Sequence, residues 1–293
     1  MVLALAVVLV VVGCGGSGSS SSEDNSSKTL TLGNIGWTEN IAVSNLTKVV
    51  FEKDLGYKEV ELKTLDVGLL FEGVAGGDLQ AFQDVWMPNH KQLLDKVGDD
   101  VEHLDPWYQG QTSFGLAVPS YMDTQSIAQL NSSGANEIVG IEPGAPFMEQ
   151  VKNHVIPAYN LNLELKAPGT AAMLAEVGRL YQDKQRFVFM PWCPHWMCAE
   201  FDFRYLDDPK NAQGDFDEPA KISTIVNSDL PDDDPVAYAF LKNFKMNADQ
   251  LNSLENEIRK AGDDPIKGSE AWLKNNRDVV QPAIDAAKQA QGS

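Results

Sequence analysis

The sequence predicts an α/β protein folded as two lobes, with a hinge and a ligand cleft between them. Short apolar and β-branched runs alternate with amphipathic stretches of helical length, which favours parallel strands covered by helices. A chain of 293 residues is also long enough for its hydrophobic core to divide into two domains. After about Lys221 the alternation gives way to helices, so the end of the chain is expected to rejoin the first lobe.

Strands are expected where short apolar or β-branched runs are bounded by turn residues. They occupy positions 29–35, 59–65, 114–118, 137–141, 161–167, 186–190 and 222–226. Helices are expected near 39–53, 67–76, 124–130, 147–158 and 170–183. Thr170 is expected to cap the last of these, and the Asp-Pro pairs at 234–235 and 264–265 to begin two later helices.

The chain is predicted to cross between the lobes near 115–120 and 206–221. Residues 29–117 and 221–293 are therefore assigned to lobe 1, and residues 118–220 to lobe 2.

The N-terminal segment indicates export. Its apolar run is too short for a membrane-spanning helix, which needs about 20 residues, but it has the length of a signal-peptide core. The string Val11-Val12-Gly13-Cys14 resembles the lipobox of bacterial lipoproteins. Residues 1–13 are therefore predicted to be a lipoprotein signal peptide, Cys14 the lipidated residue, and Gly/Ser-rich residues 14–28 a flexible tether. An ordinary signal peptide cut nearby would give the same extracytoplasmic location.

The charge and the cysteines limit the function. A net charge of −19 argues against nucleic-acid partners and against docking on anionic lipids, both of which need basic patches. The membrane is therefore expected to be reached only through the lipid anchor.

Cys193 and Cys198 form an even pair outside the cytoplasm, where a disulfide can form, although their spacing leaves the geometry open. With His195 they could instead ligate a metal in a secreted enzyme, but the spacing matches no common zinc pattern.

Several tryptophans stand where predicted strands end. Trp37 follows the first strand, Trp86 lies before a Met-Pro turn, and Trp192 follows the strand at 186–190. Ligands of open α/β sheets bind beyond the carboxyl ends of the strands. Trp107 and Trp272 are instead assigned to core packing, the more common role of a single tryptophan.

A quaternary ammonium group is the ligand that such indoles suit. It carries a positive charge but no N–H, so carboxylates cannot accept a hydrogen bond from it, whereas indole faces offer both a negative quadrupole and apolar surface. A carboxylate at the other end of the ligand would need backbone N–H groups or a histidine.

Four strings resemble the signatures of the glycine betaine-binding proteins of ABC importers, the OpuAC-like family. They are Ile35-Gly36-Trp37-Thr38-Glu39, Val85-Trp86-Met87-Pro88-Asn89, Gly140-Ile141-Glu142-Pro143-Gly144 and Trp192-Cys193-Pro194-His195-Trp196-Met197. The resemblance spans nearly the whole chain after the tether. It implies a two-lobed, type II periplasmic-binding-protein-like fold, no enzymatic activity, no cofactor and no metal. The implied partners are an ABC permease and its ATPase.

The resemblance also implies roles for single residues. Trp37, Trp86 and Trp192 match the aromatic cage around the ammonium group. The ligand carboxylate is expected near Gly144, Ala145 and Phe147, where Pro146 removes one of the family's two N–H donors. A histidine is expected to complete this end of the site.

His195 is preferred to His90 for that histidine, because its spacing from Trp192 fits the motif. Their structural alternatives are a helix-capping residue for His195 and a surface-loop residue for His90. Pro146, together with Pro191 and Cys193 around Trp192, favours a ligand other than glycine betaine itself. Choline, carnitine, proline betaine and dimethylsulfoniopropionate are the candidates.

Overall fold

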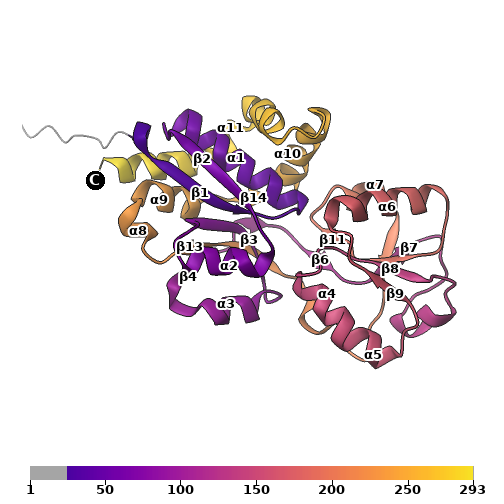
Figure 1. Ribbon diagram of the computed structural model, residues 1–293. Helices are drawn as coiled ribbons and strands as arrows, with labels where there is room; N and C mark the ends of the chain where they lie inside the picture. Colours follow the sequence, from indigo (N-terminus) through magenta and orange to yellow (C-terminus); the bar gives the residue numbers. More distant parts are fainter. Residues whose placement is uncertain (1–24, 293) are drawn as a thin grey trace, which may run out of the picture.

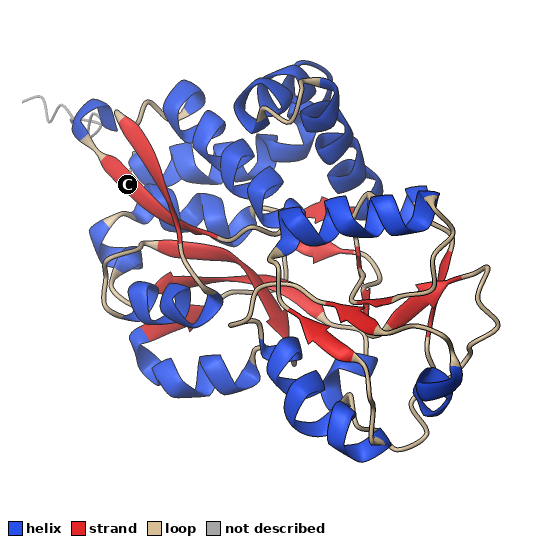
Figure 2. Ribbon diagram, turned by 45° about the vertical axis from the view of Figure 1, so that its right-hand side comes forward, coloured by secondary structure: helices blue, strands red, loops and turns tan. Residues whose placement is uncertain are grey.

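A computed structural model describes residues 25–292, and these residues form two five-stranded sheets, each covered by helices (Figure 1). The predicted α/β alternation is therefore confirmed. Figure 2 shows the two sheets in neighbouring bodies joined by extended segments. The predicted signal peptide, Cys14 and most of the predicted tether lie outside the described residues. No helix within residues 25–292 is both long and apolar enough to cross a membrane.

The first sheet has the strand order β2-β1-β3-β13-β4. Its first three strands run parallel, while β13 runs antiparallel to both β3 and β4. The strands are β1 (Thr29–Asn34), β2 (Glu59–Thr64), β3 (Ala81–Met87), β4 (Val101–His103) and β13 (Lys221–Asn227). Four of these strands come before residue 104 in the sequence, whereas β13 comes after residue 220. We call this sheet and its helices the first lobe.

The second sheet has the order β12-β7-β10-β8-β9, with β8, β9 and β10 parallel. Its strands are β7 (Ala117–Pro119), β8 (Glu137–Val139), β9 (Glu164–Lys166), β10 (Val188–Phe189) and β12 (Phe203–Tyr205). We call this sheet and its helices the second lobe. We still propose that the chain passes from the first lobe to the second between residues 117 and 118, and returns between residues 220 and 221. Two short strand pairs complete the structure: β5 (Tyr108–Gln109) with β14 (Met246–Asn247), and β6 (Ser113–Phe114) with β11 (Trp192–Cys193).

Helices from both ends of the chain gather on the first lobe, where Figure 1 shows indigo and gold ribbons side by side. They are α1 (Thr38–Asp54), α2 (Val67–Ala75), α3 (Lys91–Val97), α8 (Leu230–Asp233), α9 (Pro235–Asn243), α10 (Ala248–Lys260) and α11 (Pro265–Gln291). The second lobe carries α4 (Pro146–Gln150), the π-helical turn Val151–Val155, α5 (Ile156–Tyr159), α6 (Thr170–Gln182) and α7 (Met197–Glu200). Short 3-10 turns lie at Asn25–Ser27, Gly98–Asp100, Ile127–Ser132 and Gly214–Asp217.

The two predicted Asp-Pro helix starts are confirmed. The side chain of Asp234 accepts the backbone N–H of Ala237, and that of Asp264 accepts the backbone N–H of Lys267. In each helix the proline takes the first position, where no intrahelical N–H is needed.

Three local expectations are wrong for identifiable reasons. The structure has a central strand, β3, that the sequence did not suggest, because the polar residues Gln83 and Asp84 interrupt its apolar run although both are buried. The helix expected at 124–130 is a 3-10 turn that begins at Ile127. Gly169, not Thr170, caps α6, and the Thr170 hydroxyl donates to Glu142 instead.

The two segments that cross between the lobes are joined by a reciprocal pair of hydrogen bonds. The Thr112 hydroxyl donates to the carbonyl of Ala220 at 2.9 Å and accepts the backbone N–H of the same residue at 2.6 Å. Thr112 and Ala220 are both buried. The two crossings are therefore held together at one point, close to both sheets.

Candidate ligand-binding site

A cavity lies between the two lobes, and the space between its atoms is about 360 Å³ when the part open to solvent is included. Its wall is almost wholly aromatic and apolar, with few polar groups. The lining residues are Trp37, Glu39, Trp86, Asn89, His90, Phe114, Ile141, Ala145, Pro146, Phe147, Trp192 and Phe216. Both lobes therefore contribute to one site.

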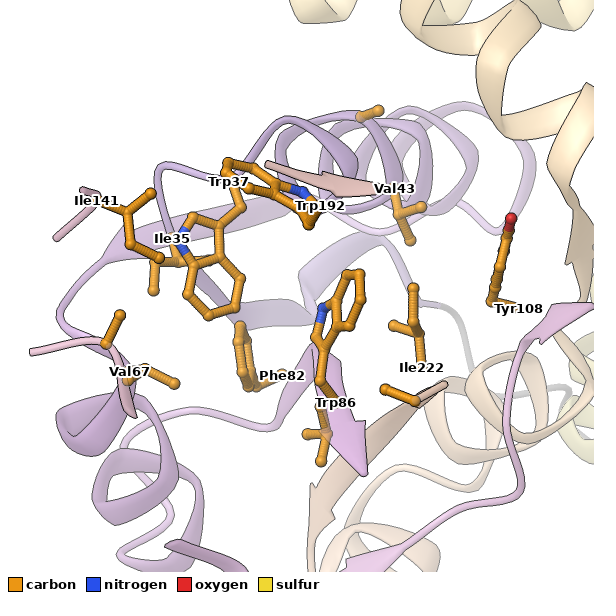
Figure 3. Packing of buried hydrophobic residues seen from close by; sticks show 14 of the residues in the cluster. Ile35, Trp37, Val43, Val67, Phe82, Trp86, Tyr108, Ile141, Trp192 and Ile222 are labelled. Atoms are coloured by element: carbon orange, nitrogen blue, oxygen red, sulfur yellow. The ribbon is translucent and has the colours of Figure 1, made fainter. Parts of the chain in front are cut away.

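The three predicted cage tryptophans meet in this cavity, as Figure 3 shows. Trp37 lies between β1 and α1, Trp86 near the end of β3, and Trp192 in β11 just after β10. The exposed fractions of these side chains are 6%, 4% and 3%. Strand ends from separate sheets thus bring together indoles that lie far apart in the sequence, as expected for a ligand site at the carboxyl edge of α/β sheets.

Each of these indoles donates its N–H to a carboxylate. Trp37 Nε1 donates to Glu142 Oε2 at 3.0 Å, and Trp192 Nε1 donates to Glu39 Oε2 at 2.8 Å. Both of these hydrogen bonds connect the two lobes. Within the first lobe, Trp86 Nε1 donates to Asp84 Oδ1 at 2.8 Å. The ring edges are therefore fixed, while the cavity is lined by the rings themselves.

These carboxylates occupy a buried environment with unusual electrostatics. Glu39 and Asp84 are fully buried. Burial is the main cause that raises the pKa of Glu39 to about 8, and burial followed by the nearby charge of Glu39 raises the pKa of Asp84. Glu255 of α10, also buried, has its pKa raised by burial to about 8 and interacts electrostatically with Glu39. A cluster of acids thus lies beside and behind the cage.

Three phenylalanines line the cavity beside the tryptophans. Phe114 packs against Phe147 with ring centroids 4.5 Å apart and lies 6.4 Å from both Trp86 and Trp192. Phe216 packs against Phe147 at 4.8 Å. These rings extend the apolar wall beyond the three tryptophans.

The structure places the two candidate histidines differently. His90 lines the cavity, and its Nδ1 accepts the backbone N–H of Trp86, so the ring proton lies on Nε2. His195 lies beside Trp192, with ring centroids 4.8 Å apart, but is not among the lining residues. Its Nδ1 accepts the backbone N–H of Met197, and its Nε2 is 2.7 Å from the hydroxyl of Thr38 in the first lobe. Burial lowers the pKa of each histidine to about 3, so both rings are neutral at physiological pH.

Residues 144–147, at the start of α4, take different positions relative to the cavity. Ala145 lines the cavity, but its N–H already donates to the carbonyl of Glu142. Pro146 takes the first position of α4 and Phe147 the second, where a backbone N–H has no acceptor inside the helix. Gly144 lies on an outer cleft that shares Asn89, Pro146 and Phe216 with the inner cavity. These three residues therefore line both the outer cleft and the inner cavity.

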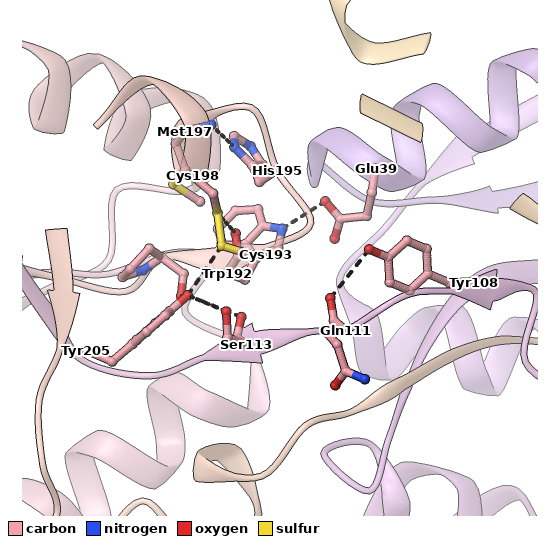
Figure 4. Close-up of a disulfide and its surroundings, with 11 residues drawn as sticks. Glu39, Tyr108, Gln111, Ser113, Trp192, Cys193, His195, Met197, Cys198 and Tyr205 are labelled. Carbon is pink, nitrogen blue, oxygen red and sulfur yellow. Dashed lines mark hydrogen bonds between the residues drawn. A yellow bond between two sulfur atoms is a disulfide. The ribbon is translucent and has the colours of Figure 1, made fainter. Parts of the chain in front are cut away.

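A disulfide joins Cys193 to Cys198, with Cα atoms 6.2 Å apart (Figure 4). It closes the short loop from Cys193 to Cys198, which contains His195 and directly follows Trp192. Since both cysteines are oxidised, they cannot serve as thiolate metal ligands. No cluster of His, Cys, Asp and Glu that could hold a metal is found in residues 25–292. With both sulfur atoms in the disulfide, Cys193 and Cys198 do not form the alternative metal site with His195.

Sequence reasoning anticipated Phe147 but missed the carboxylates of the site and its other two phenylalanines, Phe114 and Phe216. One signal was available: Asp84 stands two residues before Trp86 on one strand, a spacing that places both side chains on the same face. Glu39 similarly follows Trp37 by two positions, at the start of α1. Nothing local indicated Phe216, which lies in a 3-10 turn within the second crossing, shortly before β13.

Two α/β lobes that enclose an aromatic cavity define a ligand-binding protein of the type II binding-protein fold. A family model for the substrate-binding domain of ABC-type glycine betaine transport systems matches residues 28–275. The chain therefore belongs to this family of non-enzymatic substrate-binding proteins, as its motifs and the predicted fold class indicated.

Individual relatives agree with this assignment. The crystal structure of lactococcal OpuAC, closed and complexed with glycine betaine, has a TM-score of 0.78 and 29% identity, covering 88% of this chain and 99% of that one. The glycine betaine/L-proline-binding protein ProX from Borrelia burgdorferi has a TM-score of 0.81 and 25% identity, with coverages of 90% and 100%. The glycine betaine/carnitine transport binding protein GbuC of Listeria monocytogenes is 37% identical over 158 residues, or 53% of this chain. That match spans 51% of GbuC, about half of its length.

Proposed function

We propose that this protein captures glycine betaine or a related quaternary-ammonium or sulfonium solute and delivers it to the permease of an ABC importer. One observation carries the proposal: Trp37, Trp86 and Trp192, from both lobes, line a single buried cavity. Membership in the glycine betaine-type family and the likeness to betaine-liganded OpuAC support it.

The cage suits a cation that has no hydrogen to donate. The indole N–H groups of all three tryptophans are engaged by carboxylates, so what these rings have left to offer a ligand is their π systems and not their donors. Each cation–π contact contributes about 0.5–2 kcal/mol, and three together contribute several kcal/mol. Ring faces offer no lone-pair acceptor, so an ammonium group with N–H bonds gains less from them than a quaternary one and loses more on desolvation.

The carboxylate of a betaine would lie toward His90 and the start of α4. His90 lines the cavity with its proton on Nε2, and Phe147 has a backbone N–H that no acceptor within its helix can take. We therefore propose His90, not His195, as the histidine donor. His195 connects the lobes through Thr38 in this arrangement.

Closure of the lobes would couple capture to delivery. A ligand that contacts indoles of both lobes favours the closed state by the difference in its affinity for the two states. The closed form would be the one that the permease recognises.

We further propose that a lipid on Cys14 holds the protein at the outer side of the cell membrane, with residues beyond it as the tether.

A thermal-shift screen tests the function. Glycine betaine, carnitine, choline, proline betaine and dimethylsulfoniopropionate are compared with 3,3-dimethylbutanoate, in which carbon replaces the betaine nitrogen. A ligand that binds only the folded protein raises its melting temperature. We expect at least one of the cationic or zwitterionic compounds to stabilise the protein at concentrations where the isostere, which lacks the positive centre, does not. Equal shifts for glycine betaine and its isostere, or no shift with any cation, would overturn the proposal.

A further inference from the structure

Glu39 is placed as a ligand-facing group and not only as a support for Trp192. It lines the cavity, is fully buried, and uses Oε2 to accept the indole N–H of Trp192. Its other oxygen, Oε1, has no hydrogen-bond partner among the described residues. Behind it, Asp84 shows the same pattern: Oδ1 accepts the N–H of Trp86, while Oδ2 has no partner within residues 25–292.

Support of the indoles alone does not account for acids at these positions. The amide oxygen of glutamine or asparagine would accept the same N–H without the cost of burying a carboxylate. Two acids with one unused oxygen each, beside a cage that fits a cation, are explained when the cation supplies the missing opposite charge. Isolated buried charges are costly, whereas a paired charge is much less so.

We propose that Glu39, with Asp84 behind it, is the counter-charge of the cation in the cage, and that arrival of the cation releases a proton from this pair. The inference rests on the proposed function and adds to it a residue that determines charge specificity. In the proton release, the carboxyl O–H bond breaks, its electrons stay on the oxygen, and the proton passes to water or buffer. No electron transfer is involved.

The charged groups that act on Glu39 and Asp84 are themselves acids. Glu142 faces this pair from the second lobe and Glu255 from α10, and both are acids. His90 and His195 are buried and neutral, because burial lowers the pKa of each to about 3. None of the residues that line the cavity, all within 25–292, is a lysine or arginine. Arg259 of α10 lies near Glu255 but forms an ion pair with Glu200 and stacks on Trp196.

The sign of the pH effect follows from this arrangement. Burial raises the pKa of Glu39 to about 8, so the empty site holds a proton at neutral pH. A cation favours the ionised form and lowers that pKa. Affinity should therefore rise as the pH increases, by at most tenfold per unit, and level off above about pH 8.

Calorimetry with glycine betaine, on the full chain in paired buffers of different ionisation enthalpy, tests the inference. At pH 7 we expect release of up to one proton, and at least a threefold gain in affinity from pH 6 to pH 8. E39Q keeps an acceptor for Trp192 but should abolish both effects and weaken betaine binding at least tenfold. Its binding of 3,3-dimethylbutanoate should not weaken. D84N should act in the same direction, and E61Q, at an exposed position on β2, should behave like the wild type.

The outcomes separate the inference from the function. Wild-type binding of betaine without proton exchange, or an E39Q variant that melts normally and keeps wild-type affinity and pH dependence, overturns the counter-charge while leaving the cage intact. A wild-type protein that binds none of the quaternary or sulfonium compounds overturns the proposed function and this inference with it. If E39Q does not fold, D84N and the wild-type proton count decide.

Discussion

The indole N–H of Trp192 in the second lobe donates to the Glu39 carboxylate in the first lobe at 2.8 Å (Figure 4). The reverse arrangement holds for Trp37 of the first lobe and Glu142 of the second. Each lobe thus provides one indole donor and one carboxylate acceptor to the other. Ring orientation and lobe closure therefore depend on the same two hydrogen bonds.

Removal of the Glu142 side chain should accelerate ligand release. This carboxylate accepts hydrogen bonds from the Trp37 indole and from the backbone and hydroxyl of Thr170. E142A leaves these donors without their acceptor and weakens the closed state. We expect a dissociation rate about tenfold higher by stopped-flow tryptophan fluorescence, with a smaller change in the association rate. E164A, at an exposed position on β9, should leave the rate unchanged.

Alanine at Trp86 or Trp192 should weaken binding of a quaternary ligand at least tenfold in calorimetry. Each substitution removes a cation–π contact of about 0.5–2 kcal/mol together with apolar surface around the ligand. Phenylalanine at Trp192 retains a ring but loses the N–H bond to Glu39, so an intermediate affinity is expected. Normal binding by both alanine variants would show that the cage is assigned to the wrong residues.

Ligands with and without a carboxylate should distinguish the two histidines. H90A removes a donor from the cavity wall, so it should reduce affinity for glycine betaine more than for choline. H195A breaks a contact between the lobes, so it should reduce both affinities by a similar factor. The contribution of His90 should be constant between pH 5 and 8, because burial lowers its pKa to about 3. A larger betaine-specific loss in H195A would reverse the assignment.

Reduction of the Cys193–Cys198 disulfide should lower stability. Closure of so short a loop contributes about 2 kcal/mol by the chain-entropy relation, or roughly 5 °C in a protein of this size. Thermal melts of the wild type with and without reductant should show this difference. A C193S/C198S double variant should melt near the reduced protein and be insensitive to reductant.

Stability should fall between pH 5 and 8, in part because of Glu255. Burial raises its folded-state pKa from 4.5 to about 8, so the folded protein holds a proton that the unfolded chain releases above about pH 4.5. The contribution of Glu255 to the free energy of unfolding is fully present below its pKa in the unfolded chain. It is lost as the pH rises through its pKa in the folded protein. The melting temperature of E255Q minus that of the wild type should therefore be several degrees larger at pH 8 than at pH 5. Parallel melting curves over this range would contradict the role of Glu255.

The sequence identified the tryptophans because their signal is local: a large aromatic residue in a turn directly after a predicted strand. It did not reveal the carboxylate partners of Trp192 and Trp37, since Trp192 and Glu39 are 153 positions apart and Trp37 and Glu142 are 105 apart. Pairing at such separation is determined by packing of the lobes. Strand β3 was missed for a related reason, because its buried Gln83 and Asp84 look like surface residues in sequence.

The choice between His195 and His90 as the donor to the ligand carboxylate also depends on contacts that the sequence does not reveal. Motif spacing favoured His195, but spacing does not reveal which ring nitrogen is already engaged. His195 has both nitrogens engaged by Met197 and Thr38, whereas His90 has Nδ1 engaged by the Trp86 backbone. Only three-dimensional contacts could distinguish the two residues.

The paired hydrogen bonds between Thr112 and Ala220 restrict how the lobes can move. One side chain holds both strands of the connection side by side, so shear of one lobe past the other would break two buried bonds, whereas a turn about this point would break neither. The ligand-free molecule should therefore differ from the closed one by a rotation whose axis passes close to Thr112. The mouth of the cleft would widen most on the side farthest from that axis.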